Sequence, residues 1–495
     1  MRAGVIFCGL AALLFSAPAT AQETYAQTRA VALYGELINN STCETALPTA
    51  RTFWPSLEFQ QQLVLDDQEN FLGAVVQCAS FLQDGQAAIA AANKAHDLGA
   101  VWADKVRLVL GLSFDNDALA AQSFLDLSQS SPKDFAELES YNAWGAIRAA
   151  ERIEGGEATA LRMYDALVAA NYQPPEGYPD DPFRLDHARL LMMSGRVAEA
   201  RTRLEGVIDP QAIMTIRVSR LYDPLRSDPA FERRLDIAAA GEAAIARARA
   251  DVAREPRRLA HVIQLSALLR DMGHSDEALA LVEATLPRAQ ASDAAQNFDD
   301  VTDQLNWLLN AKADLLYDLG RNEEARTVYS EAMTAGELGS GNVTIDFAGM
   351  LNAEGRGADA QQVLQTLGRV TEYGDMWMQS ETACAAEQTH DAGARNAALT
   401  VLRAHEIANP GALMHALLCA DNMDEAAALM IRRLGNPKQR ETALVALQPY
   451  HQLATRHMAM EALELQRLAQ VRDRPDVRAA VGAVGRIEPT PIYSY

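Results

Sequence analysis

The sequence predicts an all-α protein built from stacked helix hairpins, and three observations carry this prediction. Ala, Leu, Glu, Arg and Gln dominate the composition, whereas aromatic residues make up only 6% of the chain. Five residue types recur at fixed offsets in four separate segments. The stretches on either side of these copies also resemble short helices separated by polar turns. Because a single hairpin leaves an apolar face uncovered, we expect the hairpins to stack into an α-solenoid.

Residues 1–21 predict a secretory signal peptide. Arg2 supplies a positive start, residues 3–17 form an almost unbroken apolar run, and Ala19-Thr20-Ala21 offers small residues for cleavage. A membrane anchor is disfavoured because a span needs about 20 apolar residues, and Pro18 ends this run early. We therefore expect an exported protein without an integral membrane segment after signal removal. The style of the signal and the composition favour a bacterial periplasm, with secretion as the alternative.

The charge of the chain restricts its partners. The sequence has 66 acidic and 44 basic side chains, for a net charge of −22. Such a field repels nucleic acid and anionic lipid, so we exclude nucleic-acid binding and expect a neutral or basic protein or peptide partner. Acidity that only keeps an exported helical protein soluble is an equally sufficient explanation.

Four cysteines follow the signal segment: Cys43, Cys78, Cys384 and Cys419. Each neighbouring pair is 35 residues apart, close to one helix hairpin, and export permits disulfides. The spacing favours Cys43–Cys78 and Cys384–Cys419, although four cysteines allow three connectivities. Four buried free thiols are the alternative. A metal site is less favoured, because no two cysteines have ligand spacing.

The repeated unit is centred on a turn glycine that ends the first helix in a left-handed conformation. A leucine lies four residues before each glycine, and an alanine that permits close helix packing lies five residues after it. The turn glycines are Gly195, Gly273, Gly320 and Gly355, the leucines are Leu191, Leu269, Leu316 and Leu351, and the alanines are Ala200, Ala278, Ala325 and Ala360.

This pattern resembles the tetratricopeptide repeat family, whose 34-residue unit has small, leucine, glycine, alanine and bulky positions in the same order. The match is best at 306–339, clear at 259–292, 341–374 and 181–214, and degenerate at 408–441, where Asn422 stands at the glycine position. The family's usual proline at the end of each unit is absent or displaced.

These repeats predict the domain organisation. We expect a degenerate N-terminal hairpin array at 22–235 and a tetratricopeptide-like array at 236–480, divided by the turn-rich segment 221–235. Residues 481–495, with two prolines near the end of the chain, predict a flexible tail.

The resemblance also implies a binding surface, because the first helix of each hairpin lines the concave groove in this family. Carried onto this sequence, the groove positions are Ile263, Arg270, Trp307, Asn310, Asp314, Tyr317, Ile345 and Asn352. Aromatic anchors beside amides suit recognition of a peptide or partner helix. The same residues also fit ordinary half-buried helix positions, and both interpretations stay open.

Catalytic patterns are missing from the sequence. His405-Glu406 lacks the second histidine of a zinc helix, and no nucleophile elbow or phosphate loop occurs. His415 is interpreted as a packing residue, and the acidic pairs Asp180-Asp181 and Asp299-Asp300 as solvated loop charge. We therefore predict no catalytic, cofactor-binding or metal-binding residues.

The predicted function is thus a non-catalytic scaffold for protein–protein interaction in the periplasm or cell envelope. The alternative is a helical-toroid enzyme acting on polysaccharide, as a hydrolase or lyase. That class requires a closed ring, aromatic platforms and acidic groups converging on one face, and the low aromatic content disfavours it.

Overall fold

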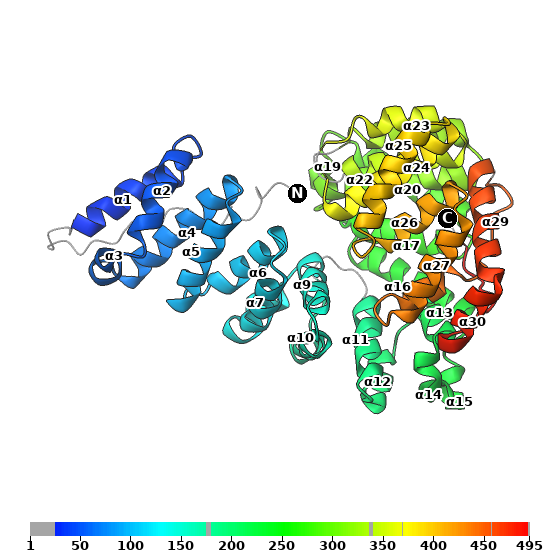
Figure 1. Ribbon diagram of the computed structural model, residues 1–495, viewed down its shortest axis with the longest axis horizontal. Coiled ribbons are helices and arrows are strands. Elements are labelled where there is room, and N and C mark those ends of the chain that lie inside the picture. The colour runs from blue at the N-terminus through cyan, green and yellow to red at the C-terminus, as the bar shows by residue number, and fades with distance from the viewer. Residues whose placement is uncertain (1–24, 175–179, 336–339, 369, 457, 494–495) are drawn as a thin grey trace. The chain divides into compact units, whose positions relative to one another are not determined.

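The computed structural model describes residues 25–174, 180–335, 340–368, 370–456 and 458–493. These residues form α-helices joined by short turns (Figure 1), which confirms the predicted all-α fold of stacked helix hairpins. They divide into two compact units that meet between residues 177 and 178. No helix in the described ranges is long and apolar enough to cross a bilayer. The predicted signal peptide at 1–21 lies outside the described residues.

The first unit is a succession of short helices, and those between residues 26 and 110 share one apolar core. A cluster of three buried phenylalanines, Phe53, Phe59 and Phe71, packs edge to face with ring centroids 5.3–5.5 Å apart. Cys43 and Cys78 form a disulfide between the second and fourth helices, with Cα atoms 5.6 Å apart. The helices are α1 (Tyr25–Leu37), α2 (Cys43–Phe53), α3 (Leu57–Gln62), α4 (Leu65–Phe81), α5 (Gly85–Asp97), α6 (Ala103–Ser113), α7 (Asp117–Ser130), α8 (Pro132–Ala136), α9 (Ser140–Arg152) and α10 (Glu157–Ala169).

The second unit contains the clear repeats. Its helices are α11 (Asp181–Met193), α12 (Val197–Leu204), α13 (Pro210–Val218), the 3-10 turn η1 (Arg220–Tyr222), α14 (Asp223–Arg226), α15 (Pro229–Glu232), α16 (Ile237–Arg254), α17 (Leu259–Asp271), α18 (Ser275–Ala289), α19 (Ala294–Asn297), α20 (Val301–Asp318), α21 (Asn322–Ala332), α22 (Ser340–Ala353), α23 (Gly357–Leu364), α24 (Glu372–Gln388), α25 (Ala392–Ala404), α26 (Pro410–Cys419), α27 (Met423–Gly435), α28 (Arg440–Ala446), α29 (Ala459–Asp473) and α30 (Pro475–Val484).

The domain boundary differs from the predicted one. The hairpin α11–α12 belongs to the second unit, so the division falls near residue 177 and not at 235. Segment 221–235 forms the short helices α14 and α15, and α14 packs against α12 within the second unit. A turn-rich sequence marks an interruption of the repeat, but it does not show whether the flanking helices stay packed together.

The turn glycines adopt the conformation that the repeat requires. Gly195, Gly273, Gly320 and Gly355 have φ values of 77°, 79°, 71° and 85°. In the degenerate repeat, however, Asp421 has the positive φ, at 55°, and Asn422 has φ −94°. The Asn422 prediction is therefore wrong by one residue. The shifted register places Leu417, Ala426 and Met430 at the repeat's apolar positions, and all three are fully buried.

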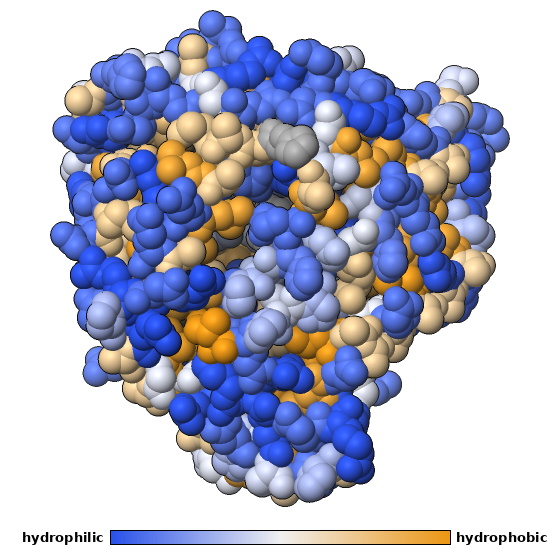
Figure 2. Space-filling view, turned by 90° about the vertical axis from the view of Figure 1, so that its right-hand side faces the viewer, coloured by the Kyte–Doolittle hydropathy of each residue, from blue (hydrophilic) through white to orange (hydrophobic). Residues whose placement is uncertain are grey.

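The first helices of successive hairpins form the inner layer of the second unit. Helices α17, α20, α22, α24 and α26 pack against one another in sequence, whereas α18, α21, α23, α25 and α27 pack mainly against the first helices beside them. A layer whose members lie closer together is on the inside of a curved stack. Figure 2 shows one face of this unit, which is hollowed near its middle.

The stack of the second unit also closes on itself. Helix α28 packs against α13, and Ser219 pairs with Gly485 in an antiparallel bridge. The Arg486 guanidinium donates to Asp223 Oδ1 at 2.6 Å, so residues near the end of the chain contact residues near the start of the array.

The predicted flexible tail at 481–495 is wrong for the residues described here. Ile492 is fully buried, and the backbone N–H of Tyr493 donates to the Asp271 carbonyl at 2.9 Å. Arg217 pairs with Glu488 at 2.7 Å. Proline spacing suggested a tail without regular structure, but an extended segment can still be fixed by ion pairs and one buried apolar side chain.

Candidate functional site

The inner helices of the second unit carry the predicted groove residues, and half of these side chains are buried and not available to a partner. Tyr317 is 0% exposed, Asn352 is 3% exposed, and Asn310 and Ile345 are also buried. Ile263, Arg270, Trp307 and Asp314 are half-buried. The groove prediction is therefore incorrect for the four buried residues, because closely packed first helices cover positions that a more open array exposes.

The polar groove residues instead belong to a row of interhelical contacts, which we call the polar ladder. It runs from α17 through α20, α22, α24 and α26 to α29. Its members are Arg270, Asn310, Asp314, Asp318, Asp346, Asn352, Glu381, His415 and Glu464.

The first contacts of the polar ladder surround Asp318, whose side chain is fully buried. Arg270 donates to this carboxylate through Nε at 2.6 Å and Nη2 at 3.0 Å, and to Asp314 at 3.2 Å. Arg456, in the segment before α29, donates to Asp318 Oδ1 at 2.7 Å. The Tyr329 hydroxyl donates a hydrogen bond to Asp314 Oδ1. The two arginines therefore compensate the buried charge at this end.

Asp346 on α22 is the member of the ladder that is exposed to solvent. Its carboxylate accepts a hydrogen bond from the Asn310 side chain. Arg270 is the basic side chain whose charge acts on this carboxylate, and it lowers the pKa less than the acidic neighbours raise it. Burial by the surrounding protein, together with the charges of Asp314 and Glu381, raises the pKa of Asp346 to about 7. A side chain on a concave surface is expected to contact solvent and also to lie close to many neighbouring groups, as Asp346 does.

A second charged cluster lies at the α26 end of the ladder. Asn352 Nδ2 donates to Glu381 Oε2 at 2.9 Å, and Glu381 Oε1 is 3.2 Å from His415 Nε2. The other ring nitrogen, Nδ1, is 2.6 Å from Glu464 Oε1 on α29. Burial alone lowers the pKa of the imidazole, but the Glu464 and Glu381 carboxylates raise the pKa of His415 well above its ordinary value. His415 is thus an imidazolium held between two carboxylates.

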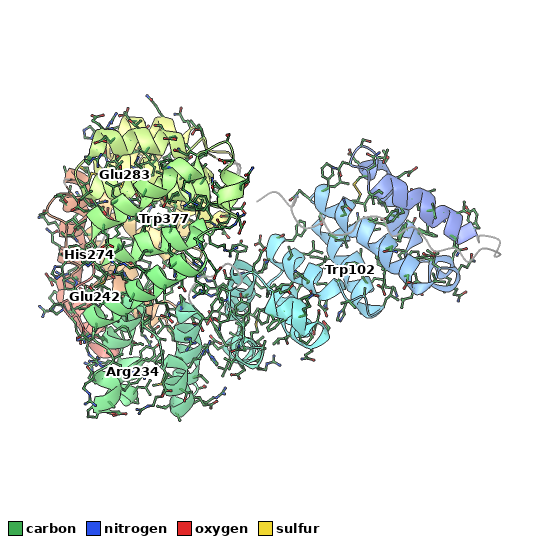
Figure 3. The ribbon with its side chains drawn as sticks, turned by 180° about the vertical axis from the view of Figure 1, so that it is seen from behind. Trp102, Arg234, Glu242, His274, Glu283 and Trp377 are labelled. Atoms are coloured by element: carbon green, nitrogen blue, oxygen red, sulfur yellow. A yellow bond between two sulfur atoms is a disulfide. The ribbon has the colours of Figure 1, made fainter. Side chains whose placement is uncertain are left out.

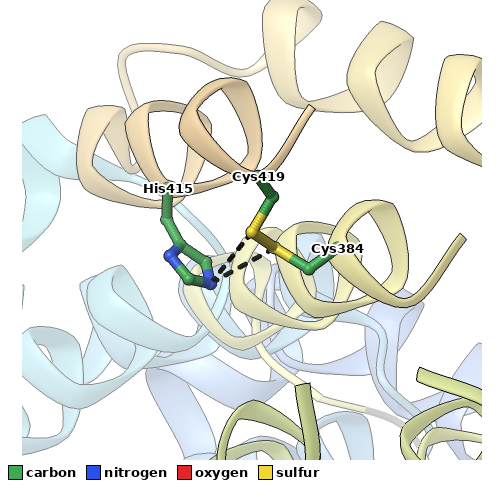
Figure 4. Close-up of side chains that lie close together, drawn as sticks. All are labelled: Cys384, His415 and Cys419. Carbon is green, nitrogen blue, oxygen red and sulfur yellow. Dashed lines mark hydrogen bonds between the residues drawn. A yellow bond between two sulfur atoms is a disulfide. The ribbon is translucent and has the colours of Figure 1, made fainter. Parts of the chain in front are cut away.

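The disulfide Cys384–Cys419 lies against this imidazolium (Figure 4). His415 Nε2 is 3.4 Å from Cys384 Sγ and 3.9 Å from Cys419 Sγ. A cleft with about 40 Å³ of space for water-sized molecules adjoins it, lined by residues of α22, α24, α26 and α29. Trp377 on α24 lies near the same histidine, with ring centroids 6.2 Å apart. The interpretation of His415 as a packing residue is therefore incomplete, because its ring nitrogens face charged and sulfur groups.

Carboxylates elsewhere on this unit have a different setting. Figure 3 labels Trp377 together with Glu242 and His274, whose Oε1 and Nε2 atoms are 3.9 Å apart. The Glu242 side chain is 70% exposed. It offers a comparison for Asp346, since both are exposed acidic residues and only Asp346 has crowded acidic neighbours.

Sequence reasoning missed Asp346, Glu381 and Glu464 entirely. Asp346 directly follows Ile345 in the sequence. The predicted groove position is therefore off by one residue, and it names a buried isoleucine in place of the exposed aspartate. Glu464 is 49 residues from His415, and no repeat signal links α29 to α26. The signal available in the sequence was the spacing of Trp377, Glu381 and Cys384, which at four and three residues share one helix face.

Comparisons with known proteins do not assign a family. No protein-family model matches the sequence, and a search of curated proteins gives no significant match. Among solved structures, the complex of Naa15/Naa10 bound to HypK-THB is 14% identical over 91% of this chain and 82% of that chain, with a TM-score of 0.21. A circular tandem repeat protein with novel repeat topology is 15% identical over 93% of this chain and 98% of that chain, with a TM-score of 0.14. Similarity at these TM-scores carries no argument about function. The fold of stacked helix hairpins makes this chain a helical repeat protein.

Proposed function

We propose that this protein is an exported, non-catalytic scaffold of the bacterial periplasm or cell envelope, and that its second unit binds a protein segment rich in basic side chains. The observation that carries the proposal is the exposed Asp346 carboxylate on the inner helix layer. Its two acidic neighbours in the ladder, Asp314 and Glu381, raise the pKa of this carboxyl more strongly than the charge of Arg270 lowers it.

The electrostatic reasoning starts from the cost of that arrangement. Like charges close together disfavour ionisation, which is why the pKa of Asp346 is raised. A lysine or arginine placed over the carboxylate removes the repulsion and favours the ionised form. The net charge of −22 adds long-range attraction for a basic partner.

Apolar side chains on the same layer of first helices supply the rest of a recognition surface. Trp307 and Ile263 are half-buried on α20 and α17, and Trp377 is half-buried on α24. Partly exposed tryptophans between polar residues are typical anchors in protein interfaces. A basic segment with interspersed apolar residues fits this combination.

The test uses fluorescent peptides of equal length that are basic, neutral or acidic, and measures binding to the full chain by anisotropy. We expect the basic peptide alone to bind, with affinity that rises from pH 6 to pH 8 as Asp346 ionises. Asp346→Asn is expected to weaken binding about tenfold, whereas Glu242→Gln on α16 serves as the matched control and leaves binding unchanged. Equal loss in both variants, or equal binding of all three peptides, would refute the proposal.

A photocrosslinking residue at position 307 then locates the bound peptide. Crosslinks from position 307 with none from position 242 support the inner layer as the surface. Position 317, a predicted groove residue, is unsuitable because Tyr317 is fully buried.

The closed stack favours one second candidate, a polysaccharide-active enzyme of the helical-toroid class. Closure through α13 and α28, and a carboxyl group with a pKa of about 7, are features that such catalysis uses. Release of reducing ends or unsaturated products from a polysaccharide panel, abolished by Asp346→Asn, would favour this candidate over the scaffold.

A further inference from the structure

The cluster at the end of the polar ladder brings four potential metal ligands of three residue types close together. Around His415 Nε2 lie Cys384 Sγ at 3.4 Å, Cys419 Sγ at 3.9 Å and Glu381 Oε1 at 3.2 Å. The donor atoms of the two cysteines and the histidine all lie within 4.8 Å of one another. They come from only two helices, α24 and α26, whose residues 381 and 384 and residues 415 and 419 lie one turn apart.

These separations suit a tetrahedral Zn²⁺ site. With Zn–S near 2.3 Å and Zn–N or Zn–O near 2.0–2.2 Å, ligand atoms in such a site are roughly 3.3–3.8 Å apart. The distances to His415 Nε2 cover almost the same range. The sulfurs are closer than that only because they are bonded to each other.

The atoms behind the four donors are also arranged as they are around a bound metal. His415 Nδ1 bonds the Glu464 carboxylate at 2.6 Å, which fixes the ring with Nε2 toward the sulfurs. Glu381 Oε2 accepts from Asn352 at 2.9 Å, which leaves Oε1 directed at His415. Metal-binding histidines and carboxylates are usually held by such outer hydrogen bonds.

We propose that reduction of the Cys384–Cys419 disulfide opens a Zn²⁺ site formed by Cys384, Cys419, His415 and Glu381, with Glu464 as the positioning residue for the histidine. The disulfide and the metal-bound state are then two alternative states of one cluster. This inference does not depend on the proposed binding function.

The conversion needs a two-electron reductant, and a dithiol serves as the example here. Two electrons pass from the dithiol to the S–S bond, which breaks; the dithiol becomes a disulfide, and its two protons end on Cys384 and Cys419. Zn²⁺ then displaces one proton from each thiol and one from Nε2 of the His415 imidazolium, so three protons enter solvent. Reoxidation by a disulfide compound takes two electrons from the thiolates and releases Zn²⁺ as the S–S bond forms.

Access to the cluster supports this chemistry. Cys419 is half-buried and lines the 40 Å³ cleft together with His415, so a reductant and a metal ion can approach from solvent. The charged residues that line the cleft besides His415 are Glu387, Glu461, Glu464 and Arg467, and their net negative charge favours a cation.

The second disulfide of the chain is a built-in control. Cys43 and Cys78 are buried to 1% exposure or less, and the Cys78 sulfur lies 3.3 Å from the Cys43 carbonyl oxygen. Their sulfurs lie in the apolar core of the first unit, so reduction there creates no comparable ligand set.

The experiment titrates the full chain with Co²⁺, a coloured substitute for Zn²⁺, after anaerobic reduction with a phosphine that does not compete for metal. We expect one equivalent to bind with a thiolate-to-cobalt charge-transfer band and the strong visible bands of tetrahedral Co²⁺, and Zn²⁺ to bleach both. The unreduced protein is expected to show neither band. Cys384→Ser should abolish the charge-transfer band, and the double variant Cys43→Ser/Cys78→Ser should retain it.

Glu464→Gln keeps the test valid even where a cysteine variant fails to fold, because all four ligands remain. Loss of the outer carboxylate should weaken Zn²⁺ binding about 10–100-fold while the spectrum persists. The proposal is overturned if reduced wild type gives no thiolate-to-cobalt band, or if the Cys43→Ser/Cys78→Ser variant loses the band as Cys384→Ser does.

Discussion

The buried charge of Asp318 offers the sharpest test of how the second unit is held together. This side chain is 0% exposed and accepts charge-assisted hydrogen bonds from Arg270 on α17 and from Arg456 before α29. It therefore ties the inner layer to the segment that leads to the end of the chain. Replacement by asparagine keeps the shape of the side chain and removes its charge.

The expected loss is large because two arginines would remain in the same place. Arg456 is only 5% exposed and Arg270 15% exposed, so solvent cannot replace the missing carboxylate. Removing one partner of a buried ion pair typically costs about 3–5 kcal/mol. Arg456 retains Glu461, at 2.9 Å, as a second acidic partner. We therefore expect Asp318→Asn to cost about 3 kcal/mol, the lower end of that range.

The assay is urea unfolding at neutral pH, followed by circular dichroism and by hydrogen exchange in α29. The matched control is Asp359→Asn, which breaks an exposed pair with Arg356 and should cost at most about 1 kcal/mol. Exchange in α29 should accelerate only in the Asp318 variant. If the two variants lose the same stability, or if α29 stays protected, the buried charge does not hold this segment and the reasoning is refuted.

Three further predictions concern single features. Because the pKa of Asp346 is raised to about 7 in the folded state, folding stability falls as the pH rises from about 4 to about 7. In thermal melts, Asp346→Asn should therefore stabilise the protein by about 1 kcal/mol at pH 8, after allowance for solvent screening. The same variant should have no effect on stability at pH 4. Removal of residues 486–495 deletes the buried Ile492 and the ion pairs Arg217–Glu488 and Arg486–Asp223. This deletion should lower the free energy of unfolding by roughly 2–4 kcal/mol. An unchanged free energy of unfolding would show that the segment is a free tail. Cys43→Ser/Cys78→Ser opens a loop of 35 residues and should cost about 4 kcal/mol in denaturant unfolding, whereas a loss below about 1 kcal/mol would contradict the disulfide.

The helix hairpins could be predicted because each is specified locally. Four turn glycines at fixed offsets from a leucine and an alanine determine where one helix ends and the next one packs. The closure between α13 and α28 could not be predicted, since it depends on the summed rotation of all intervening hairpins. For the same reason Arg486 and Glu488 looked like tail residues, although their partners are Asp223 and Arg217.

The degenerate repeat shows the limit of reading a turn from residue preference alone. Asp421 and Asn422 are adjacent, and both residue types tolerate the left-handed conformation. Asparagine was preferred on that ground, but the choice of register is made by packing. With Asp421 as the turn residue, the apolar positions of the repeat fall on Leu417, Ala426 and Met430, which are all fully buried.

The candidate site was predicted in part, and the missing part has a common physical cause. The resemblance to the tetratricopeptide family assigned Arg270, Asn310, Asp314 and Asn352 to first helices, and these helices form the inner layer. It did not show that the next helix would supply a partner to each of them, as Asp318 does for Arg270 and Glu381 does for Asn352. Exposure on a first helix depends on how closely its neighbour packs, and this distance is not encoded within one repeat.

The close packing of neighbouring first helices also limits which residues can bind a partner. A polar side chain already bonded to the adjacent helix contributes to the angle between hairpins, and a partner must break that contact before it can bind there. Asn352 is such a residue, since its amide donates to Glu381 at 2.9 Å. At Asp346 the charges of Asp314 and Glu381 outweigh that of Arg270, so a basic ligand that reaches the carboxylate relieves a repulsion. Binding specificity in this array should therefore follow from the ladder positions that its own helices leave uncompensated, and not from the groove positions of a generic repeat.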